Sequence, residues 1–256
     1  MAETSQSRLQ QALSNRTPIW GGWVTGPTLI GPEEFARAGY DYVGFDAQHG
    51  YLDDADIAGI LRRLEHVPIA TAVRLPNADA APIGRVLDAG ADAVIIAMIE
   101  SADQAAAAVA ATRYQPAGIR SFGPLRASLG YDPAAHESRV SVFAMIETAA
   151  ALDNLGEICA VDGLTGIYVG PADLALSLGV DAIGATRHPE VLNVIARIYH
   201  AGAHAGLVTG IHASEGKTGR AMAEQGFRMI TLAAESQALR RGAAEHLREA
   251  REVGEQ

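Results

Sequence analysis

Short apolar runs alternate with helix-like segments along the whole of this 256-residue chain. The segments after the runs are rich in Ala, Leu, Glu and Arg, and their apolar residues recur every three or four positions, as on one face of an amphipathic helix. Several segments end in Gly, the residue that most easily terminates a helix. The runs themselves are short and apolar, which is typical of buried strands. They span residues 19–24, 42–46, 69–75, 93–98, 140–146, 165–170, 207–212 and 228–233.

Eight strands alternating with eight helices predict an α/β fold, and in a chain of this length they predict a (β/α)8 TIM barrel. We therefore treat residues 1–256 as one catalytic barrel domain with a short N-terminal helix at about residues 4–15. An open, doubly wound sheet is the alternative. It is disfavoured because no glycine-rich phosphate-binding turn follows the first run.

Residues 113–139 form a longer connection than compact domains normally contain. Long loops of this kind are usually functional lids or disordered segments. The arginines and aromatic residues of the segment argue against disorder. We therefore predict that 113–139 is an active-site loop.

The composition excludes several classes of partner. The chain carries a net charge of −10 and a pI of about 5.2, so a nucleic acid or an anionic membrane surface would be repelled. The most apolar stretch, residues 93–111, is interrupted by Glu100 and Asp103 before it could span a bilayer. The N-terminal residues lack the basic start and apolar run of a signal peptide, so we expect a cytoplasmic protein. The single cysteine, Cys159, is expected to be a small buried hydrophobe.

Polar side chains follow four of the predicted strands. They are Asp46 and His49 after the second strand, Arg74 at the end of the third, Glu147 after the fifth and Asp173 after the sixth. Each has a structural alternative when it is taken alone, such as a helix cap for Asp173 or a surface loop for His49. In a TIM barrel, however, the carboxyl ends of all strands meet at the rim that holds the active site. Their convergence at this rim therefore favours a functional role.

Glu147 and Asp173 suggest a metal site. Neighbouring strands lie about 5 Å apart, so carboxylates at the ends of two neighbouring strands can share one cation. Oxygen ligands suit a hard divalent ion, Mg²⁺ or Mn²⁺, with Co²⁺ as a further candidate. The tetrapeptide AMIE occurs twice, and it also places Glu100 at a strand end. We assign Glu100 a structural role because its strand is more distant and because Ser101 begins a predicted helix.

These residues together suggest chemistry on a small α-keto acid. A divalent ion beside the guanidinium of Arg74 would hold the carboxylate and keto oxygens of such a molecule. An imidazole held by a carboxylate, His49 by Asp46, suits proton transfer near neutral pH. The only lysine, Lys217, lies in a predicted helix, so a Schiff-base mechanism is disfavoured.

Six motifs resemble those of one known family. They are FDAQHG (45–50), VRLPN (73–77), LDAGADAVIIAM (87–98), RYQPAGIRSFGP (113–124), MIETAAALDNLGEI (145–158) and GIYVGPADLALSLG (166–179). This set is similar to the HpcH/HpaI family of class II, metal-dependent pyruvate aldolases, which includes 4-hydroxy-2-oxoheptanedioate and 2-keto-3-deoxy sugar acid aldolases. The resemblance runs from about residue 21 to residue 235, and its most specific part is the pair MIET and VGPADL.

The resemblance implies an activity and an assembly. It implies an aldehyde-lyase that cleaves or forms 4-hydroxy-2-oxo acids from pyruvate or hydroxypyruvate and an aldehyde. It also implies a barrel whose last helix is exchanged between subunits, in a homohexamer built as a trimer of dimers. For the site it implies metal ligands at Glu147 and Asp173, a keto-acid-binding Arg74 and a His49–Asp46 pair, with no organic cofactor. The backbone of Gly170, Pro171 and Ala172 is implied to contact the keto-acid carboxylate.

Two positions depart from the family pattern. Many members carry Glu where this chain has Gln48, which lowers the negative charge beside His49. Well-known members have Gln where this chain has Met145, two residues before the predicted metal ligand. A side chain that could hydrogen-bond the keto acid is then absent, so we do not expect strict selectivity for pyruvate, and we expect an additional hydroxyl on the donor, as in hydroxypyruvate, to be tolerated there.

Two other functions stay open. One is a carbon–carbon lyase of coenzyme A thioesters, of the citrate lyase β or malyl-CoA lyase type, which requires a basic groove for the nucleotide. This acidic chain has no evident groove of that kind outside residues 113–139. The other is a barrel that binds a keto acid without turnover. Such a protein would not need the proton-transfer pair Asp46 and His49.

Overall fold

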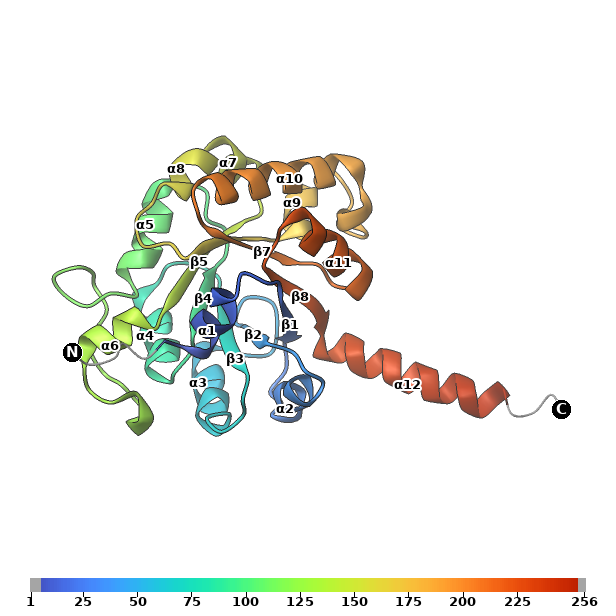
Figure 1. The fold of residues 1–256 in the computed structure, drawn as a ribbon, viewed down its shortest axis with the longest axis horizontal. Coiled ribbons are helices and arrows are strands. Elements are labelled where there is room, and N and C mark those ends of the chain that lie inside the picture. The colour runs from blue at the N-terminus through green and yellow to red at the C-terminus, as the bar shows by residue number, and fades with distance from the viewer. Residues whose placement is uncertain (1–5, 253–256) are drawn as a thin grey trace.

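Eight parallel strands close into a barrel in the computed structural model, which describes residues 6–252 of the chain (Figure 1). Each strand pairs with its neighbours in sequence, and the first also pairs with the last, so the sheet has no open edge. The strands are β1 (Ile19–Val24), β2 (Tyr42–Asp46), β3 (Ala70–Leu75), β4 (Ala93–Ile96), β5 (Ser141–Ile146), β6 (Gly166–Val169), β7 (Val208–His212) and β8 (Met229–Ala234). The predicted (β/α)8 barrel is confirmed, and each predicted strand bound lies within two residues of the observed one.

Helices surround this barrel, and sequence signals fix where several of them begin. Asp53 accepts a hydrogen bond from the backbone N–H of Asp56 at 2.8 Å and caps α3. Ser101 caps α5 through the backbone N–H of Gln104. The helices are α1 (Arg8–Ser14), α2 (Ile30–Arg37), α3 (Asp54–Arg63), α4 (Ala80–Asp88), α5 (Ala102–Ala110), α6 (Pro133–Ser138), α7 (Ala149–Asp153), α8 (Leu155–Cys159), α9 (Pro171–Ser177), α10 (Pro189–His204), α11 (Gly216–Gln225) and α12 (Glu235–Glu252), with short 3-10 helices at Ala127–Leu129 and Ala185–Arg187.

The strand side chains alternate between two apolar cores, because successive residues of a strand point to opposite faces. Val43 and Val73 point outward and pack in the core beneath the helices. Tyr42 and Tyr168 point inward and fill the barrel. Leu9 of α1 joins this inner core, so the N-terminal helix contributes to the packing inside the barrel. The helix predicted at about residues 4–15 is observed over 8–14, and residues 4 and 5 lie outside the described part of the chain.

Gly44 leaves space for an aromatic ring on the inner face of the barrel. Gly44 of β2 has no side chain, and a Cβ built there would lie only 2.2 Å from the six-membered ring of Trp23. The absence of a side chain at Gly44 therefore lets the Trp23 indole lie across the interior. This indole contacts several groups of the site described below.

Residues 113–139 lie at the end of the barrel where the strands begin, whereas the predicted site residues lie at the end where the strands finish. The prediction that this segment is an active-site loop of its own chain is therefore wrong. The segment follows α5 rather than β4, and connections from a helix to a strand lie at the end where strands begin. Three of its arginines form ion pairs with residues at the ends of helices or the start of a strand at that end: Arg120 with Asp88 at 2.7 Å, Arg126 with Glu65 at 3.4 Å, and Arg139 with Asp92 at 2.8 Å. These three arginines therefore fasten the segment to the barrel.

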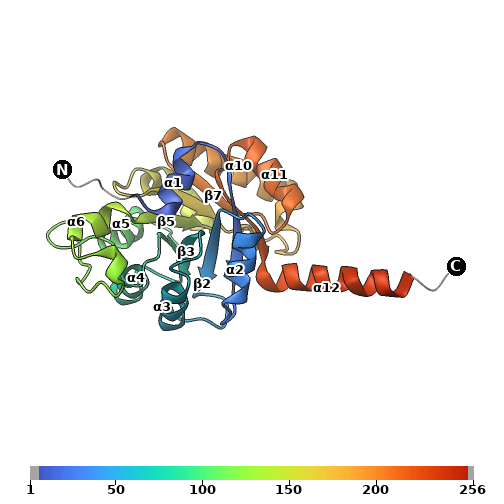
Figure 2. The same cartoon turned by 60° about the horizontal axis from the view of Figure 1, so that its bottom comes forward.

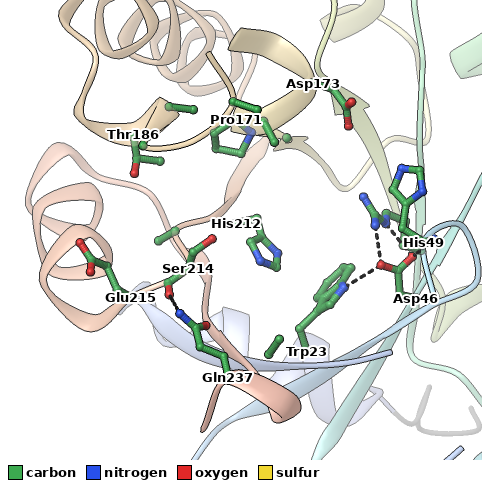
Figure 3. A pocket seen from close by; sticks show the side chains of 18 of the residues that line it. Trp23, Asp46, His49, Pro171, Asp173, Thr186, His212, Ser214, Glu215 and Gln237 are labelled. Atoms are coloured by element: carbon green, nitrogen blue, oxygen red, sulfur yellow. Dashed lines mark hydrogen bonds and ion pairs between the residues drawn. The ribbon is translucent and has the colours of Figure 1, made fainter. Parts of the chain in front are cut away.

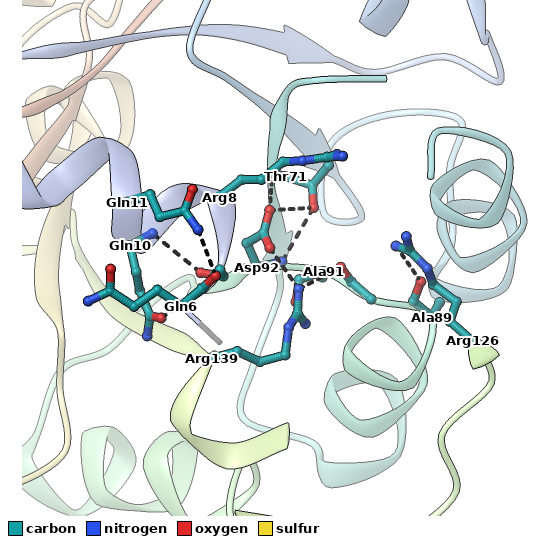
Figure 4. Close-up of polar contacts among 12 residues, drawn as sticks. Gln6, Arg8, Gln10, Gln11, Thr71, Ala89, Ala91, Asp92, Arg126 and Arg139 are labelled. Atoms are coloured by element: carbon teal, nitrogen blue, oxygen red, sulfur yellow. Dashed lines mark hydrogen bonds and ion pairs between the residues drawn. The ribbon is translucent and has the colours of Figure 1, made fainter. Parts of the chain in front are cut away.

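Asp92 is the centre of these contacts (Figure 4). Its carboxylate accepts a hydrogen bond from the backbone N–H of Thr71 at 2.9 Å, besides the ion pair with Arg139. Arg8 of α1 lies close by and donates to the backbone carbonyl of Val67. This network ties α1, β3, β4 and the long segment together beneath the barrel.

The last helix, α12, extends away from the barrel in both views (Figures 1 and 2). Its start is anchored by Glu235, whose carboxylate accepts from the backbone N–H of Gly26 at 2.9 Å, and by Gln237, whose amide donates to the backbone carbonyl of Ser214 at 3.1 Å. The side chains of 238–251 are all exposed, including Leu239 at 75% and Leu247 at 50%.

Two further expectations concern single features. Cys159 is buried, and burial raises the pKa of its thiol to about 11, in agreement with the expected structural role. Within residues 6–252, none of the helices combines the length and apolar character that crossing a bilayer requires.

Candidate active site

A cavity of about 490 Å³ opens at the carboxyl ends of the strands (Figure 3). Seven of the eight residues predicted for the site line it, contributed by the ends of β2, β3 and β6: Asp46, His49, Arg74, Gly170, Pro171, Ala172 and Asp173. The eighth, Glu147, lies directly behind the wall, against Gly170. The structure thus brings all of the predicted site residues to one place.

Asp46 and Arg74 form a buried ion pair in the floor of this cavity. The two side chains end neighbouring strands in the same register, with Asp46 paired to Arg74 across β2 and β3. Arg74 donates from Nε to Oδ1 at 3.0 Å and from Nη2 to Oδ2, and Trp23 donates from Nε1 to Oδ2 at 3.1 Å. The guanidinium also lies 5.5 Å from the centre of the Trp23 ring. Burial alone would raise the pKa of Asp46, but the bonds from Arg74 and its charge hold that pKa below its ordinary value.

The predicted contact between the His49 imidazole and Asp46 is not observed. Asp46 instead accepts hydrogen bonds from the backbone N–H groups of Gln48 at 3.0 Å and His49 at 2.9 Å. This is the pattern of an Asx turn, in which an Asp side chain replaces a backbone acceptor and turns the chain. Both carboxylate oxygens are then occupied by the turn, Arg74 and Trp23. The His49 side chain is exposed and lines the cavity.

Glu147 is fully buried, and only one of its two carboxylate oxygens has a hydrogen-bond partner among the described residues. Its Oε1 accepts a hydrogen bond from the backbone N–H of Met98 at 2.8 Å, whereas Oε2 has no partner among the described residues. A Cβ at Gly170 would lie 2.3 Å from Oε2, so the carboxylate occupies space that only a glycine leaves free. Burial raises the pKa of Glu147, and the negative charge of Asp173 raises it further. A buried carboxylate oxygen without a partner, close to a second carboxylate, fits a cation site.

Met98 was not anticipated from the sequence. Its backbone has a φ of 56°, in the left-handed region that non-glycine residues rarely occupy. This conformation occurs at the residue that directs its N–H to Glu147. The two copies of the AMIE motif are therefore in contact, because Met98 of the first copy donates its backbone N–H to Glu147 of the second.

Asp173 lies in the first turn of α9, where the strand β6 leads through Gly170 into the helix. Its side chain is partly exposed and lines the cavity. No group of three or more His, Cys, Asp and Glu side chains suited to a metal ion exists in residues 6–252, so the acidic pair stands alone. Glu100 is not among the lining residues, and its backbone N–H donates to Gln104 at the start of α5. The structural role of its side chain stays a prediction.

His212 also lies in the cavity, and sequence reasoning did not include it. It ends β7, and its ring meets the Trp23 indole edge-on at 5.2 Å between ring centres (Figure 3). Burial lowers the pKa of His212 to about 4, and the charge of Arg74 lowers it further against the opposing effect of Asp46. A signal was present in the sequence, because an imidazole closes the seventh apolar run just as Asp46 and Arg74 close the second and third.

More exposed polar side chains surround the mouth. They include Thr186 from the connection after α9, Ser214 and Glu215 after β7, and Gln237 of α12 (Figure 3). Arg187, next to Thr186 in the chain, is exposed and also lines the cavity. The floor, by contrast, combines the buried ion pair with apolar side chains such as Trp23 and Met145. A small anion would therefore be held at the floor, and a second molecule would approach from the mouth.

Comparison with known proteins finds similar sequences and a similar fold. The family model described as "HpcH/HpaI aldolase/citrate lyase" matches residues 21–241. A "Hydroxypyruvate/pyruvate aldolase" of Rhizorhabdus wittichii is 37% identical, over 91% of this chain and 94% of the relative. A "4-hydroxy-2-oxovalerate aldolase" of Novosphingobium aromaticivorans is also 37% identical, over 98% of this chain and 97% of the relative. The crystal structure of an HpcH/HpaI aldolase/citrate lyase family protein from Burkholderia cenocepacia superposes with a TM-score of 0.88 at 33% identity, covering 96% of this chain and all of the other.

Proposed function

This chain belongs to the HpcH/HpaI aldolase/citrate lyase family, and from that premise we propose that it is a divalent-metal-dependent aldolase acting on 4-hydroxy-2-oxo acids. It would cleave these acids to, or form them from, an aldehyde and a 2-oxo acid, either pyruvate or hydroxypyruvate. The observation that carries the proposal is the unpartnered Oε2 of buried Glu147, close to Asp173 and to the guanidinium of Arg74.

Glu147 and Asp173 would hold the metal, Mg²⁺ or Mn²⁺, with Co²⁺ as a further candidate. Both are hard oxygen ligands, and the orphaned Oε2 of Glu147 gains a partner when a cation binds. When bound, such an ion polarises the keto group of the substrate and compensates the negative charge that develops on its oxygen. Met98 fixes the other carboxylate oxygen of Glu147, so the ligand is oriented before the ion arrives.

Arg74 and the start of α9 would bind the carboxylate of the 2-oxo acid. Asp46 uses Nε and Nη2 of the guanidinium, and no hydrogen bond within residues 6–252 uses Nη1. Arg74 lines the cavity and its guanidinium is held by two bonds to Asp46, so Nη1 is the nitrogen left for a bound carboxylate. The backbone from Gly170 to Ala172 lines the same cavity, and the N–H of Ala172 is at the N-terminus of a helix.

His49 would move the proton of the 4-hydroxyl. In the cleavage direction it accepts this proton while the bond between C3 and C4 breaks and the 4-oxygen becomes the aldehyde carbonyl. In the synthetic direction it returns the proton to the new hydroxyl. Asp46 was expected to orient the His49 imidazole. Its observed contacts instead hold the backbone of His49 and the side chain of Arg74.

We also propose that α12 is exchanged with another subunit, in a hexamer built as a trimer of dimers. The support is a helix that extends from the barrel with Leu239 and Leu247 exposed. Burial of such side chains against a second copy would remove apolar area from water. Light scattering coupled to size-exclusion chromatography would give the mass directly, and a monomer at micromolar concentration would contradict this assembly.

The activity can be tested with a matrix of donors and aldehydes. The purified protein would be incubated with pyruvate or hydroxypyruvate and a series of aldehydes, with Mg²⁺ or Mn²⁺ and then with a chelator. We expect formation of 4-hydroxy-2-oxo acids that ends when the metal is removed and returns when it is added back. Malyl-CoA and citryl-CoA serve as the comparison, and turnover of a CoA thioester without turnover of any 4-hydroxy-2-oxo acid would contradict the proposal.

A further inference from the structure

His212 is the one titratable group at the floor of the described cavity that the proposed reaction leaves without a task. Its ring points into the cavity (Figure 3). No hydrogen bond joins it to another protein group within residues 6–252, although its ring packs edge-on against Trp23. The imidazole therefore presents its nitrogens to whatever fills the cavity.

The position of His212 is that of a floor residue rather than a mouth residue. The Trp23 indole contacts both the Arg74 guanidinium, at 5.5 Å, and the His212 ring, at 5.2 Å. A 2-oxo acid held by Arg74 therefore lies over the same indole as the imidazole. Residues that meet an incoming aldehyde first, such as His49 and Arg187, are exposed at the mouth.

The imidazole is neutral at physiological pH, because burial and the charge of Arg74 lower its pKa to about 4. A neutral imidazole offers one N–H donor and one nitrogen acceptor. It can therefore both donate to and accept from a hydroxyl group, and it adds no charge that would attract a second carboxylate.

The surroundings make an unpaired imidazole costly. The neighbouring floor and wall side chains, Trp23, Met145 and Ala234, have no group directed to pair with it. In the empty cavity water can satisfy the ring, but a ligand that displaces this water must replace its hydrogen bonds. A methyl group cannot do so, whereas a hydroxymethyl group can.

We propose that His212 selects the donor, by hydrogen-bonding a hydroxyl on C3 of the 2-oxo acid, so that hydroxypyruvate-type donors are preferred over pyruvate. This inference rests on the proposed aldolase function. It assigns the preference to a residue on β7, next to β6 and the start of α9. Met145 lines the same cavity and carries no hydrogen-bond donor for this hydroxyl, so His212 supplies its partner.

Two substitutions of His212 separate hydrogen bonding from shape. His212→Phe keeps a ring against Trp23 but removes both nitrogens, and His212→Gln keeps an amide that donates and accepts. The matched control is His204→Phe, which changes an exposed histidine at the end of α10. For each protein, kcat/KM would be measured for hydroxypyruvate and pyruvate with one fixed aldehyde, and Kd for each donor would be measured in Mg²⁺ without aldehyde.

The expected result is a change in the donor ratio. The wild-type protein and His204→Phe should favour hydroxypyruvate in both kcat/KM and Kd. His212→Phe should reduce this preference roughly 10–100-fold, the range for removing one partner of a buried hydrogen bond, and His212→Gln should retain part of it. An unchanged ratio in His212→Phe, or an altered aldehyde preference with an unaltered donor ratio, would overturn the assignment.

The outcomes also separate this inference from the function on which it rests. If both donors turn over but the ratio of their kcat/KM values is the same with and without the His212 imidazole, the aldolase function stands and the inference fails. If hydroxypyruvate binds more tightly than pyruvate in a His212-dependent way but nothing turns over, recognition stands and the aldolase function fails. If neither donor binds in Mg²⁺, both are overturned.

Discussion

The carboxylate of Glu147 lies against the backbone of Gly170, so that a Cβ at Gly170 would be 2.3 Å from Oε2. The two residues come from neighbouring strands, β5 and β6, and the glycine leads directly into α9 and Asp173. Gly170 thus leaves the space that the Glu147 carboxylate occupies, and it also precedes the helix that carries Asp173.

Gly170→Ala should weaken metal binding without unfolding the protein. The backbone at 170 has φ −100° and ψ 91°, which alanine adopts freely, so the effect comes from displacing the Glu147 carboxylate and the Met145 methyl group, which would lie 2.3 Å and 2.7 Å from the added Cβ. We expect Mn²⁺ affinity to fall roughly 10–100-fold, as for other residues that orient a ligand. Titration calorimetry measures this, with Gly84→Ala as control because a Cβ there meets no atom within 4 Å. Equal affinity in the two variants would count against the proposed site.

Glu147→Gln and Asp173→Asn should each abolish metal-dependent turnover, because each removes one of two anionic ligands while keeping the shape of the side chain. Glu100→Gln changes the glutamate of the first AMIE motif, and it should retain most of the activity. Activity and Mn²⁺ affinity would be measured together. Full activity of Glu147→Gln in the presence of chelator would show that the carboxylates have a structural role only.

Arg74→Lys should be severely impaired although the charge is kept. An ammonium cannot donate two parallel bonds to Asp46 and still direct a third donor into the cavity. We expect kcat/KM to fall roughly 10²-fold, as for a misplaced substrate. The control is Arg85→Lys, which changes a more exposed arginine paired with Asp54. A lysine variant with near wild-type kcat/KM would indicate that Arg74 does not contact substrate.

His49→Ala should lower kcat by about 10²–10⁴-fold while leaving Mn²⁺ affinity nearly unchanged, because it removes a proton-transfer group and no ligand. Asp46→Asn should act differently, mainly by raising KM, since the carboxylate holds Arg74 rather than the imidazole ring. Steady-state kinetics of both variants distinguish these effects. Loss of metal affinity in proportion to activity in His49→Ala would reassign His49 as a ligand.

The protonation of His212 predicts a pH dependence of stability. The folded protein keeps this imidazole neutral down to a pH of about 4, whereas the unfolded chain protonates it below about 6.5. The unfolded state therefore binds more protons in this window, so the free energy of unfolding falls as the pH is lowered, by up to about 1.4 kcal/mol per pH unit. Urea unfolding between pH 7 and pH 4 should show a shallower slope for His212→Phe than for the wild-type protein or His204→Phe. Identical slopes would mean that His212 is protonated in the folded state.

The sequence was sufficient for the features that depend on neighbouring residues. Strand positions followed from short apolar runs, and the start of α5 followed from Ser101, because a cap bonds a backbone group three residues away. Asp46 and Arg74 were also recognisable as site residues, since each ends an apolar strand and the rim of the barrel is a consequence of the fold class.

The tertiary structure decided the partners. Asp46 pairs with Arg74 rather than with the nearby imidazole, because the strand register of β2 and β3 brings together side chains 28 residues apart. Glu147 is held by Met98, 49 residues away, for the same reason. Local sequence carries no information on such a register, which depends on how all eight strands close.

The placement of the long segment and of His212 needed the three-dimensional fold as well. Residues 113–139 have the composition of a binding loop, but which end of a barrel a connection occupies depends on whether it follows a strand or a helix, and this one follows α5. The sequence shows only that His212 ends an apolar run. Its place at the floor of the cavity became clear from its contact with the Trp23 ring. The sequence by itself determined the elements and the chemical types at the rim, because both depend on local periodicity. Which of those groups face one another was decided by long-range packing, because it alone sets the distances between strands that are far apart in sequence.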